Sequence, residues 1–532
     1  MQHSTDPLVR DSIHDAYRAL SNSAYQEAHA HCMRVLERAP LTPEPYFILA
    51  LIGAAHGNFS KALDVVDRAL RLDSGNPAYH AHRAKFLTAL HRHAEAVQTA
   101  ERAVASSPQD ALTWDTIGVV FTRAGLHEQA VSAYRRAVEV DQRAGSKQAS
   151  YWYNLGAALQ FVGELEGAAS ALRRVLEIEP AHERAWSGLA KLGLTAEEVA
   201  RLETLASRPA ASVDAELHLC HALASHYESI GRYRDAFALW ERGKARKRET
   251  LGYSFESDRV IFEAARLTAQ PSAGEGYPSR APIFVVGMPR TGTTLIERIL
   301  SSHPEVLTLG ERDELSLCIK KLTGTRTRHV LDAETLRAAA AMDVTSAGED
   351  YIDSLRYVTG QAQRFVDKLP LNFLYAGLIR RALPQARIVC LRRNPIDTCL
   401  SNYRQLFSTN FPHYDYSYDL LDTARYYVEF DRLARHWRET LGDRYMEIEY
   451  EDVVENPERA ARTLLAFCEL EWHPACLEFH RNRAPVATAS SAQVRQPLYR
   501  GAMGRWRHYE RELEPLIALL HEHGIALESP VR

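Results

Sequence analysis

The sequence contains no long apolar run and no strong excess of either charge. None of its stretches reaches the ~18 apolar residues that a membrane-spanning helix needs, and the first residues, Met1 to Asp6, contain no apolar leader core. The formal net charge of −4 argues against a general nucleic-acid-binding protein or a protein of the membrane surface. We therefore expect a cytoplasmic protein whose partners include neither nucleic acid nor membrane, and the oligomeric state stays open.

Cysteine is also scarce. The seven cysteines form no C-x-x-C pair, which argues against a disulfide framework or a cysteine-held zinc site and predicts a reducing compartment. Several lie within apolar runs, so we expect core thiols and no bound metal. The cysteines are Cys32, Cys220, Cys318, Cys390, Cys399, Cys468 and Cys476.

Small residues recur every 34 positions in the first half of the chain. The three parallel series are Ala16, Ala50, Ala84 and Gly118; Ala28, Ala62, Ala96 and Ala130; and Val35, Ala69, Ala103 and Ala137. A small residue at each position lets the two helices of a unit approach closely. One such pair cannot bury its apolar face alone, so neighbouring units stack.

This period, with a tryptophan four residues before Gly118, resembles tetratricopeptide repeats over residues 10–195. A further set, Ala224, Ala236 and Gly243, extends the predicted repeat domain to residues 10–247. The resemblance implies a concave groove that docks a peptide or protein partner. A scaffold or an oligomer contact without a ligand is the open alternative.

Residues 248–280 form a predicted linker, which ends in a stretch rich in Gly, Pro and Ser. From residue 281 to residue 532, apolar strands alternate with amphipathic helices such as Leu371–Ala382 and Tyr426–Leu441. This alternation predicts a parallel sheet that binds ligands at the carboxyl ends of its strands. The predicted strands are Ile283–Val286, Val306–Leu309, Phe365–Asp367, Arg387–Leu391 and Tyr445–Ile448.

The first of these strands leads into a loop that is suited to an anion. Gly287 and Gly292 bracket four residues, and Thr293 and Thr294 open a helix, so several backbone N–H groups converge on one point. The spacing resembles a nucleotide-binding P-loop, but Thr293 stands where that loop has its lysine. Asp367 is the only candidate for holding Mg²⁺. The sequence thus predicts an anion site that works without metal. This site lies in a P-loop-like α/β domain that follows an all-helical solenoid along the chain.

A second phosphate site is predicted at the end of another strand. Arg393 follows the apolar run of residues 387–391, and Ser401 lies eight residues further on, roughly two helical turns away on the same side. An arginine fork with a hydroxyl is well suited to phosphate. The alternative is a surface arginine pair beside Asn394, which would then cap the helix.

Two such sites in this order resemble the sulfotransferases that use 3′-phosphoadenosine 5′-phosphosulfate (PAPS), and the protein-tyrosine sulfotransferases in particular. The resemblance covers roughly residues 281–510. The matching segments are Pro289-Arg290-Thr291-Gly292-Thr293-Thr294-Leu295, His303-Pro304 with Gly310-Glu311, Asp367-Lys368-Leu369-Pro370, Tyr450-Glu451-Asp452-Val453, and Ser490-Ser491-Ala492-Gln493-Val494 with Arg505-Trp506.

The resemblance implies a role for each matching residue. Glu311 would be the general base, and Arg290 and Lys368 would stabilise the charge that develops during transfer. The 5′-phosphosulfate would lie on Arg290, Thr291, Gly292, Thr293 and Thr294, and the 3′-phosphate on Arg393, Ser401, Tyr450, Ser491 and Arg505. Each of three residues also has a simpler interpretation when the resemblance is set aside. Glu311 could be a solvated carboxylate at a helix start, and Lys368 could be a surface lysine. His303 could be a residue that packs in a loop.

The sequence therefore predicts a metal-free sulfotransferase with PAPS as the donor. The repeats would dock an acceptor, for which the resemblance implies a peptide or protein tyrosine. The alternatives are a carbohydrate or small-molecule hydroxyl as acceptor, a P-loop kinase or nucleoside triphosphatase, and a scaffold whose second half is inactive.

Overall fold

The computed structural model describes residues 6–270, 274–360, 362–409, 411–486, 488, 493–498 and 500–527. Its contacts divide into two compact units, Met1–Val162 with Glu166–Ile178 and Gly163–Leu165 with Glu179–Arg532. Within the described part of the chain, no helix combines the length and the apolarity needed to cross a membrane.

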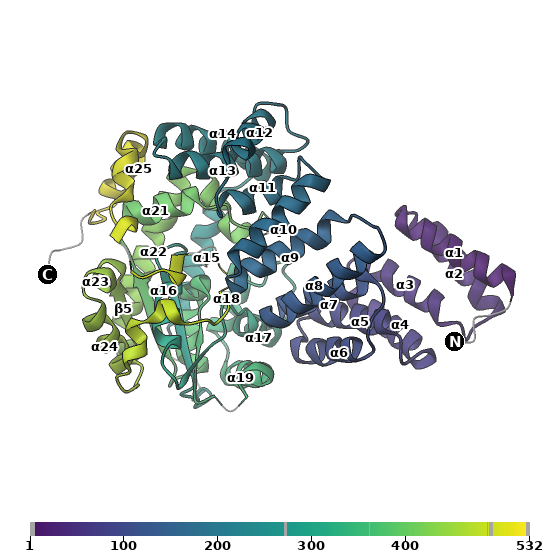
Figure 1. Ribbon diagram of the computed structural model, residues 1–532. Coiled ribbons are helices and arrows are strands. Elements are labelled where there is room, and N and C mark those ends of the chain that lie inside the picture. The colour runs from purple at the N-terminus through teal and green to yellow at the C-terminus, as the bar shows by residue number, and fades with distance from the viewer. Residues whose placement is uncertain are drawn as a thin grey trace. The chain divides into compact units, whose positions relative to one another are not determined.

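The first unit is a series of helix pairs, coloured purple to blue in Figure 1. The pairs are α1 (Pro7–Ser21) with α2 (Tyr25–Arg38), α3 (Pro43–Ala55) with α4 (Phe59–Leu72), α5 (Pro77–Ala89) with α6 (His93–Ala105), α7 (Ala111–Arg123) with α8 (His127–Arg143), and α9 (Ala149–Val162) with α10 (Leu165–Ile178). The predicted helical repeat is thereby confirmed.

The periodic small residues lie where the two helices of a pair cross. A side chain added at Gly118 would place its Cβ 2.5 Å from the Tyr134 ring, so only glycine fits this crossing. The end of the preceding unit is also fixed, because the Trp114 indole donates a hydrogen bond of 2.9 Å to the Pro108 carbonyl. The spacing read from the sequence thus reflects contacts within each pair.

A five-stranded parallel sheet is the centre of the second unit, in the order β2-β3-β1-β4-β5. The strands are β1 (Pro282–Gly287), β2 (Val306–Thr308), β3 (Arg364–Asp367), β4 (Arg387–Arg392) and β5 (Tyr445–Glu449). Each of the five predicted strands is confirmed, with bounds within one or two residues of the prediction.

Helices surround this sheet. They are α16 (Thr293–Ser301), α17 (Glu314–Thr323), α18 (Ala333–Ala340), α19 (Thr345–Thr359), α20 (Ala376–Ala382), α21 (Pro395–Arg404), α22 (Leu420–Thr440), α23 (Tyr450–Glu455), α24 (Pro457–Phe467) and α25 (Glu510–Glu522). Short 3₁₀ turns are η1 (Pro370–Tyr375), η2 (Pro412–Tyr418), η3 (Gly442–Arg444), η4 (Pro474–Leu477), η5 (Phe479–Arg481), η6 (Gln493–Arg495), η7 (Arg500–Ala502) and η8 (Arg505–Tyr509). The helix predicted over Leu371–Ala382 therefore consists of η1 followed by α20.

Alternate side chains of β1 enter two separate cores, as the pleat of a strand requires. Phe284 and Val286 belong to the core on the face of α17, α19, α20 and α22, and Ile283 and Val285 to the core with α16, α23 and α24. Because both faces of the sheet are covered, every residue of β1 is buried. This explains the continuous apolar run in the sequence.

Five more helices precede the sheet in the second unit: α11 (Glu183–Ala190), α12 (Ala196–Ala206), α13 (Val213–Ser229), α14 (Tyr233–Leu251) and α15 (Phe255–Leu267). The pair α13 and α14 has the small residues predicted for a repeat, yet it belongs to the same compact unit as the sheet. The buried Lys244 ammonium of α14 donates to the carbonyls of Gln405 at 3.2 Å and Ser417 at 2.8 Å. The repeat-domain boundary at residue 247 stays a prediction.

The segment predicted as a linker, residues 248–280, contains helix α15. Phe262 of α15 is buried and contacts the rings of Phe373 and Tyr426, with centroids 5.8 and 5.0 Å apart. Arg266 forms an ion pair of 2.5 Å with Glu429 of α22. Residues 255–267 are therefore part of the core around the sheet and not an open connection.

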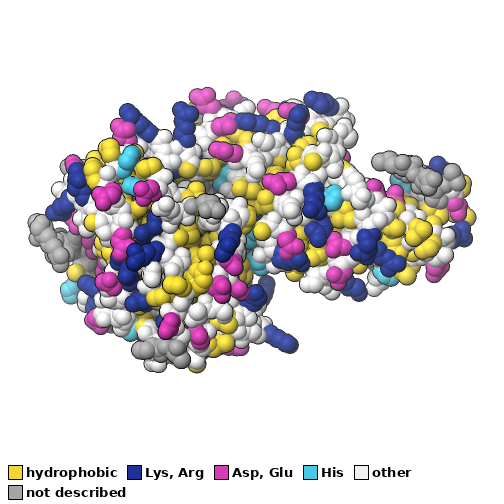
Figure 2. All heavy atoms as spheres, turned by 90° about the horizontal axis from the view of Figure 1, so that it is seen from below, with side chains coloured by type: hydrophobic (Ala, Val, Ile, Leu, Met, Phe, Trp, Pro, Cys, Tyr) yellow, Lys and Arg dark blue, Asp and Glu magenta, His cyan; other side chains and the backbone are white. Residues whose placement is uncertain are grey.

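The distribution of charged side chains and the burial of the cysteines match what the composition predicts. Figure 2 shows basic and acidic side chains interspersed over the face that it presents, as a small net charge leads one to expect. Within the described residues all seven cysteines are free thiols, and six of them are buried. Burial raises the pKa of Cys390 to about 12, so this thiol stays protonated at neutral pH.

Candidate active site

The loop between β1 and α16 is tightly folded. The backbone of Arg290 has φ +65°, and Gly292 has φ +107°, a conformation that glycine adopts without steric cost. A Cβ at Gly292 would lie 2.7 Å from the Tyr450 ring, so the ring packs directly against the loop. The Thr291 hydroxyl closes the turn with a hydrogen bond of 2.8 Å to the Met288 carbonyl.

Helix α16 begins immediately after this turn. The Leu295 N–H donates to the Gly292 carbonyl at 2.8 Å, and the buried side chains of Thr293 and Thr294 occupy the first turn. The N–H groups at a helix start have no partner within the helix and favour negative charge. The predicted order of strand, tight turn and helix is observed here, and the binding of an anion at this loop stays a prediction.

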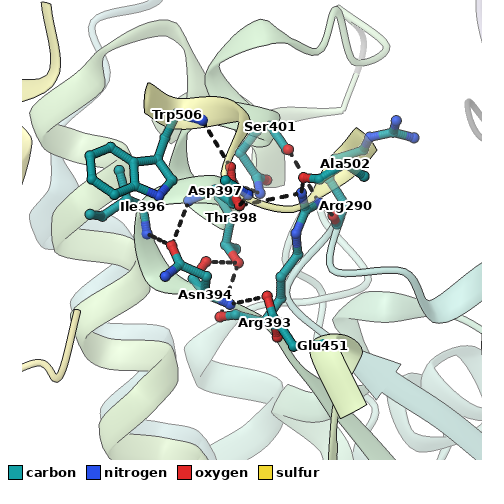
Figure 3. Close-up of polar contacts among 12 residues, drawn as sticks. Arg290, Arg393, Asn394, Ile396, Asp397, Thr398, Ser401, Glu451, Ala502 and Trp506 are labelled. Carbon is teal, nitrogen blue, oxygen red and sulfur yellow. Dashed lines mark hydrogen bonds and ion pairs between the residues drawn. The ribbon is translucent and has the colours of Figure 1, made fainter. Parts of the chain in front are cut away.

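Arg393 lies between this loop and helix α21 (Figure 3). Its guanidinium donates to the Arg290 carbonyl at 3.0 Å, to the Ser401 hydroxyl at 3.4 Å and to the Ala502 carbonyl at 2.5 Å. It also lies over the Tyr450 ring, 5.0 Å from the centroid. Arg393 is buried, which rules out a surface arginine.

Asn394 and Asp397 fix the start of α21. The Asn394 carboxamide accepts from the Ile396 and Asp397 backbones at 3.0 and 3.1 Å, so it does cap the helix, as one alternative held. The buried Asp397 carboxylate accepts from the backbone N–H groups of Gly504 at 2.7 Å and Trp506 at 3.1 Å. The carboxyl-terminal segment is thereby attached beside Arg393.

A cavity opens between the loop, α21 and this segment. Seven of the residues predicted to bind the donor are Arg290, Gly292, Thr294, Arg393, Ser401, Tyr450 and Arg505, and all of them line it. Thr291 and Thr293 belong to the same loop but not to the lining. Ser491 lies outside the described residues. The remaining lining residues are Leu295, Arg404, Phe479, Val494, Gln496, Pro497, Leu498 and Ala502.

Lys368 and Glu311 form an ion pair at the neighbouring strand ends. The Lys368 ammonium lies 2.6 Å from Glu311 and 3.8 Å from Glu297 of α16. Lys368 is 0% exposed, which rules out a surface lysine, whereas the Glu311 side chain is 39% exposed and open to solvent. Burial lowers the pKa of the Lys368 ammonium, but Glu311 and Glu297 raise it above its usual 10.5, so the group is charged.

Each strand of the sheet delivers one part of this site at its carboxyl end. In sheet order these parts are Glu311 after β2, Lys368 after β3, residues 288–292 after β1, Arg393 after β4 and Tyr450 after β5. Ligands of open α/β sheets bind along this edge. The order of the strands therefore brings together residues that are up to 139 positions apart in the chain.

Three charged residues of the site were not predicted. Glu297 is the second carboxylate on Lys368, Arg404 lines the cavity, and Glu228 of α13 forms an ion pair with Arg404. Arg404 lies three residues after Ser401 on the same helix, so its position could have been read from the sequence. Glu228 gives no such signal, because 176 residues separate it from Arg404.

Asp367 and His303, two further residues considered in the sequence, pack within the fold. Asp367, the candidate for holding Mg²⁺, is fully buried and accepts a hydrogen bond of 2.8 Å from the Tyr351 hydroxyl. Burial raises its pKa well above the usual range, which disfavours the carboxylate form that binds a cation. His303 packs in a loop, with Nε2 3.0 Å from the Glu471 carbonyl, as its alternative interpretation held.

Comparisons with known families match both halves of the chain. Residues 282–474 match the sulfotransferase family, and residues 15–77 and 109–180 match tetratricopeptide repeats. The sequence resemblance to sulfotransferases that carry such repeats is thereby confirmed.

Individual relatives match the chain at low identity. An uncharacterized protein of Aquifex aeolicus is 33% identical over 63% of this chain and 45% of its own length. A protein-tyrosine sulfotransferase of Drosophila melanogaster is 26% identical over 47% of this chain and 52% of its own length. Protein-tyrosine sulfotransferase A of Caenorhabditis elegans is 24% identical over 44% of this chain and 63% of its own length. The chain thus spans about half the length of these relatives.

Proposed function

We propose that this chain, whose residues 282–474 form a sulfotransferase-family domain accompanied by tetratricopeptide repeats, transfers a sulfuryl group from PAPS to an acceptor hydroxyl. The observation that carries this proposal is the order of groups along the sheet edge. A carboxylate and an ammonium stand on one side of the loop of residues 288–292, and an arginine with a hydroxyl on the other.

The residues around the cavity fit such a donor. The start of α16 would hold the 5′-phosphosulfate through backbone N–H groups, and Arg393 with Ser401 would hold the 3′-phosphate. Within the described part of the chain, the Arg393 Nε is buried without a hydrogen-bond acceptor, so the guanidinium has donor capacity left for an anion. The absence of a loop lysine at Thr293 and the buried state of Asp367 disfavour a Mg²⁺-dependent nucleoside triphosphatase.

Sulfuryl transfer needs a base for the acceptor and positive charge for the leaving group. Glu311 would take the proton of the acceptor hydroxyl as its oxygen attacks sulfur. As the bond from sulfur to the bridging oxygen breaks, negative charge grows on that oxygen. Lys368, Arg290 and the N–H groups at the start of α16 would stabilise it. The ion pair of Lys368 with Glu311 holds both groups in place before the acceptor binds.

The proposed acceptor is supported by two distant relatives. Both are protein-tyrosine sulfotransferases, so a peptide or protein tyrosine is the acceptor that we propose, with the repeats as its docking module. A transfer assay with labelled sulfate from PAPS and tyrosine peptides, carbohydrates and small phenols as acceptors distinguishes these classes. A cytoplasmic location stays a prediction.

Donor specificity gives the direct test of the proposed cofactor pocket. Adenosine 3′,5′-bisphosphate should raise the melting temperature of the full chain without Mg²⁺, because it offers both phosphates to the two anion sites. ATP with Mg²⁺ should raise it little or not at all. Stabilisation by ATP that depends on Mg²⁺, without stabilisation by the bisphosphate, would favour a triphosphatase instead.

Arg393→Ala should weaken binding of adenosine 3′,5′-bisphosphate by at least about 100-fold, because a buried hydrogen bond to a charged group contributes roughly 1.5–3 kcal/mol and two or more are lost. Isothermal titration calorimetry measures the change. The matched control is Arg481→Ala, whose side chain is 70% exposed. Equal affinity in the two variants would remove Arg393 from the phosphate site.

A further inference from the structure

Arginines stand at the amino-terminal ends of four adjacent strands, on the edge of the sheet opposite the candidate active site. Arg364 is the first residue of β3, Arg280 lies two residues before β1, Arg387 is the first residue of β4, and Arg444 directly precedes β5. The sheet order β3-β1-β4-β5 places these starts side by side. We call these four residues the arginine row.

Arg364 lacks the partners that a buried guanidinium requires. It is 8% exposed, and its Nε and Nη2 atoms have no hydrogen-bond acceptor among the residues that the structure describes. Burial lowers the pKa of this guanidinium, Cys468 and Glu469 oppose this in part, and the positive charges of Arg387 and Arg280 lower the pKa further. Unpaired buried charges are costly, so the position favours the arrival of negative charge.

Arg387 is only partly satisfied. It pairs with Glu469, donates to the Asp443 carbonyl at 2.9 Å and lies 5.1 Å from the centroid of the Phe467 ring. Its Nε atom is buried and has no acceptor in the described ranges. The N–H groups that have no acceptor among the described residues therefore come from Arg364 of β3 and Arg387 of β4, the two strands on either side of β1.

Little negative charge opposes the row. Glu469 is 42% exposed and serves both Arg387 and, at 3.7 Å, Arg444. The hydrogen bond from Arg387, opposed in part by burial, and the charges of Arg387, Arg280 and Arg444 lower the pKa of Glu469. Asp443 lies 3.6 Å from Arg444, but its side chain is 79% exposed, so solvent screens its negative charge from the row. Among the described residues, the side-chain hydrogen bond that Arg280 donates goes to the neutral Gln385 side chain, at 3.1 Å.

We infer that the arginine row binds a phosphate- or sulfate-type oxyanion between Arg364 and Arg387. A tetrahedral oxyanion offers several acceptors to the planar fork of a guanidinium, which suits the orphaned N–H groups of both arginines. The Glu469 carboxylate competes with this anion for Arg387. Strands of four to six residues separate the row from the cavity, on the order of 15 Å at ~3.3 Å per residue, so this is a second and separate site.

The test measures stabilisation of the full chain by inorganic phosphate and by sulfate. Sodium chloride holds the ionic strength constant, and adenosine 3′,5′-bisphosphate is present throughout to occupy the cavity. The wild type should be stabilised by both anions with saturation. Arg364→Met should weaken the fitted affinity at least tenfold, whereas Arg481→Met, an exposed arginine with the same charge change, should leave it unchanged.

Glu469→Gln provides an independent variant of the same site. Removal of the competing carboxylate should tighten oxyanion binding several-fold. A parallel titration with ATP distinguishes a free inorganic anion from a nucleotide phosphate as the ligand. Equal affinities in Arg364→Met and Arg481→Met overturn the proposal, as does stabilisation no greater than that by chloride. If Arg364→Met does not fold, unchanged affinity in Glu469→Gln overturns it.

Because the row does not involve the cavity, its test is separate from the test of the proposed function. An inactive chain that still binds phosphate at the row would reject the sulfotransferase proposal alone. A chain that binds adenosine 3′,5′-bisphosphate but shows no second oxyanion site would reject only the row.

Discussion

Glu311→Gln should lower sulfate transfer by roughly 10²–10⁴-fold, the usual contribution of a positioned general base. The amide keeps the shape of the side chain but cannot take a proton from the acceptor hydroxyl. Because the Glu311 side chain is 39% exposed and lies outside the cavity lining, the variant should fold and bind adenosine 3′,5′-bisphosphate as the wild type does.

The measurement is the rate of labelled-sulfate transfer at saturating donor, together with calorimetry of bisphosphate binding. Glu334→Gln, which changes an exposed glutamate at the start of α18, is the matched control. Turnover that survives in Glu311→Gln would show that another group takes the acceptor proton. Loss of both turnover and bisphosphate affinity would instead indicate a structural role.

Lys368→Met should affect both catalysis and stability. Loss of a buried cation beside the developing negative charge is expected to lower turnover about 10²–10³-fold. The change also leaves the Glu297 carboxylate buried, with a hydrogen bond of 2.5 Å from Thr308 but without a cation. Breaking a buried pair in this way typically costs about 3–5 kcal/mol of unfolding free energy.

The pH dependence follows from the direction of the Lys368 pKa. Its pKa in the folded state lies above 10.5, so the ion pair contributes its full stability below pH 10.5 and loses it as the pH rises through the folded-state value. Urea unfolding at neutral pH should therefore show the full loss in Lys368→Met, and the gap to the wild type should narrow as the pH rises through the folded-state pKa of Lys368.

Lys321→Met is the control for Lys368→Met, because that lysine is 77% exposed and pairs with Asp350 on the surface. It should change stability by less than about 1 kcal/mol. Equal stability of Lys368→Met and Lys321→Met would mean that the Lys368 pair contributes nothing to the fold.

Elements with a strong local pattern could be predicted from the sequence. The strand of residues 283–286 shows as an apolar run because both of its faces are covered, and the 34-residue period reflects contacts within each helix pair. The loop with Gly292 and the pair Arg393 with Ser401 are also local patterns, so their place at the sheet edge followed from strand–helix alternation alone.

Features that depend on packing between distant segments could not be predicted. Composition marked residues 248–280 as a linker, although Phe262 is buried against Phe373 and Tyr426. Glu297 reaches Lys368 only because α16 packs beside β3. The arginine row consists of residues separated by up to 164 positions, and the strand order alone brings them together.

The carbonyl groups of Arg290 and Ala502 both accept hydrogen bonds from the Arg393 guanidinium, which affects the entropy change when the cavity binds an anion. They hold the guanidinium in a fixed direction, desolvated and stacked on Tyr450, with the Gly504 and Trp506 backbones anchored on Asp397. The entropy of ordering this side chain is therefore lost during folding and not during association. Such preorganisation predicts rigid-body docking of the donor, with an affinity set mainly by its dissociation rate.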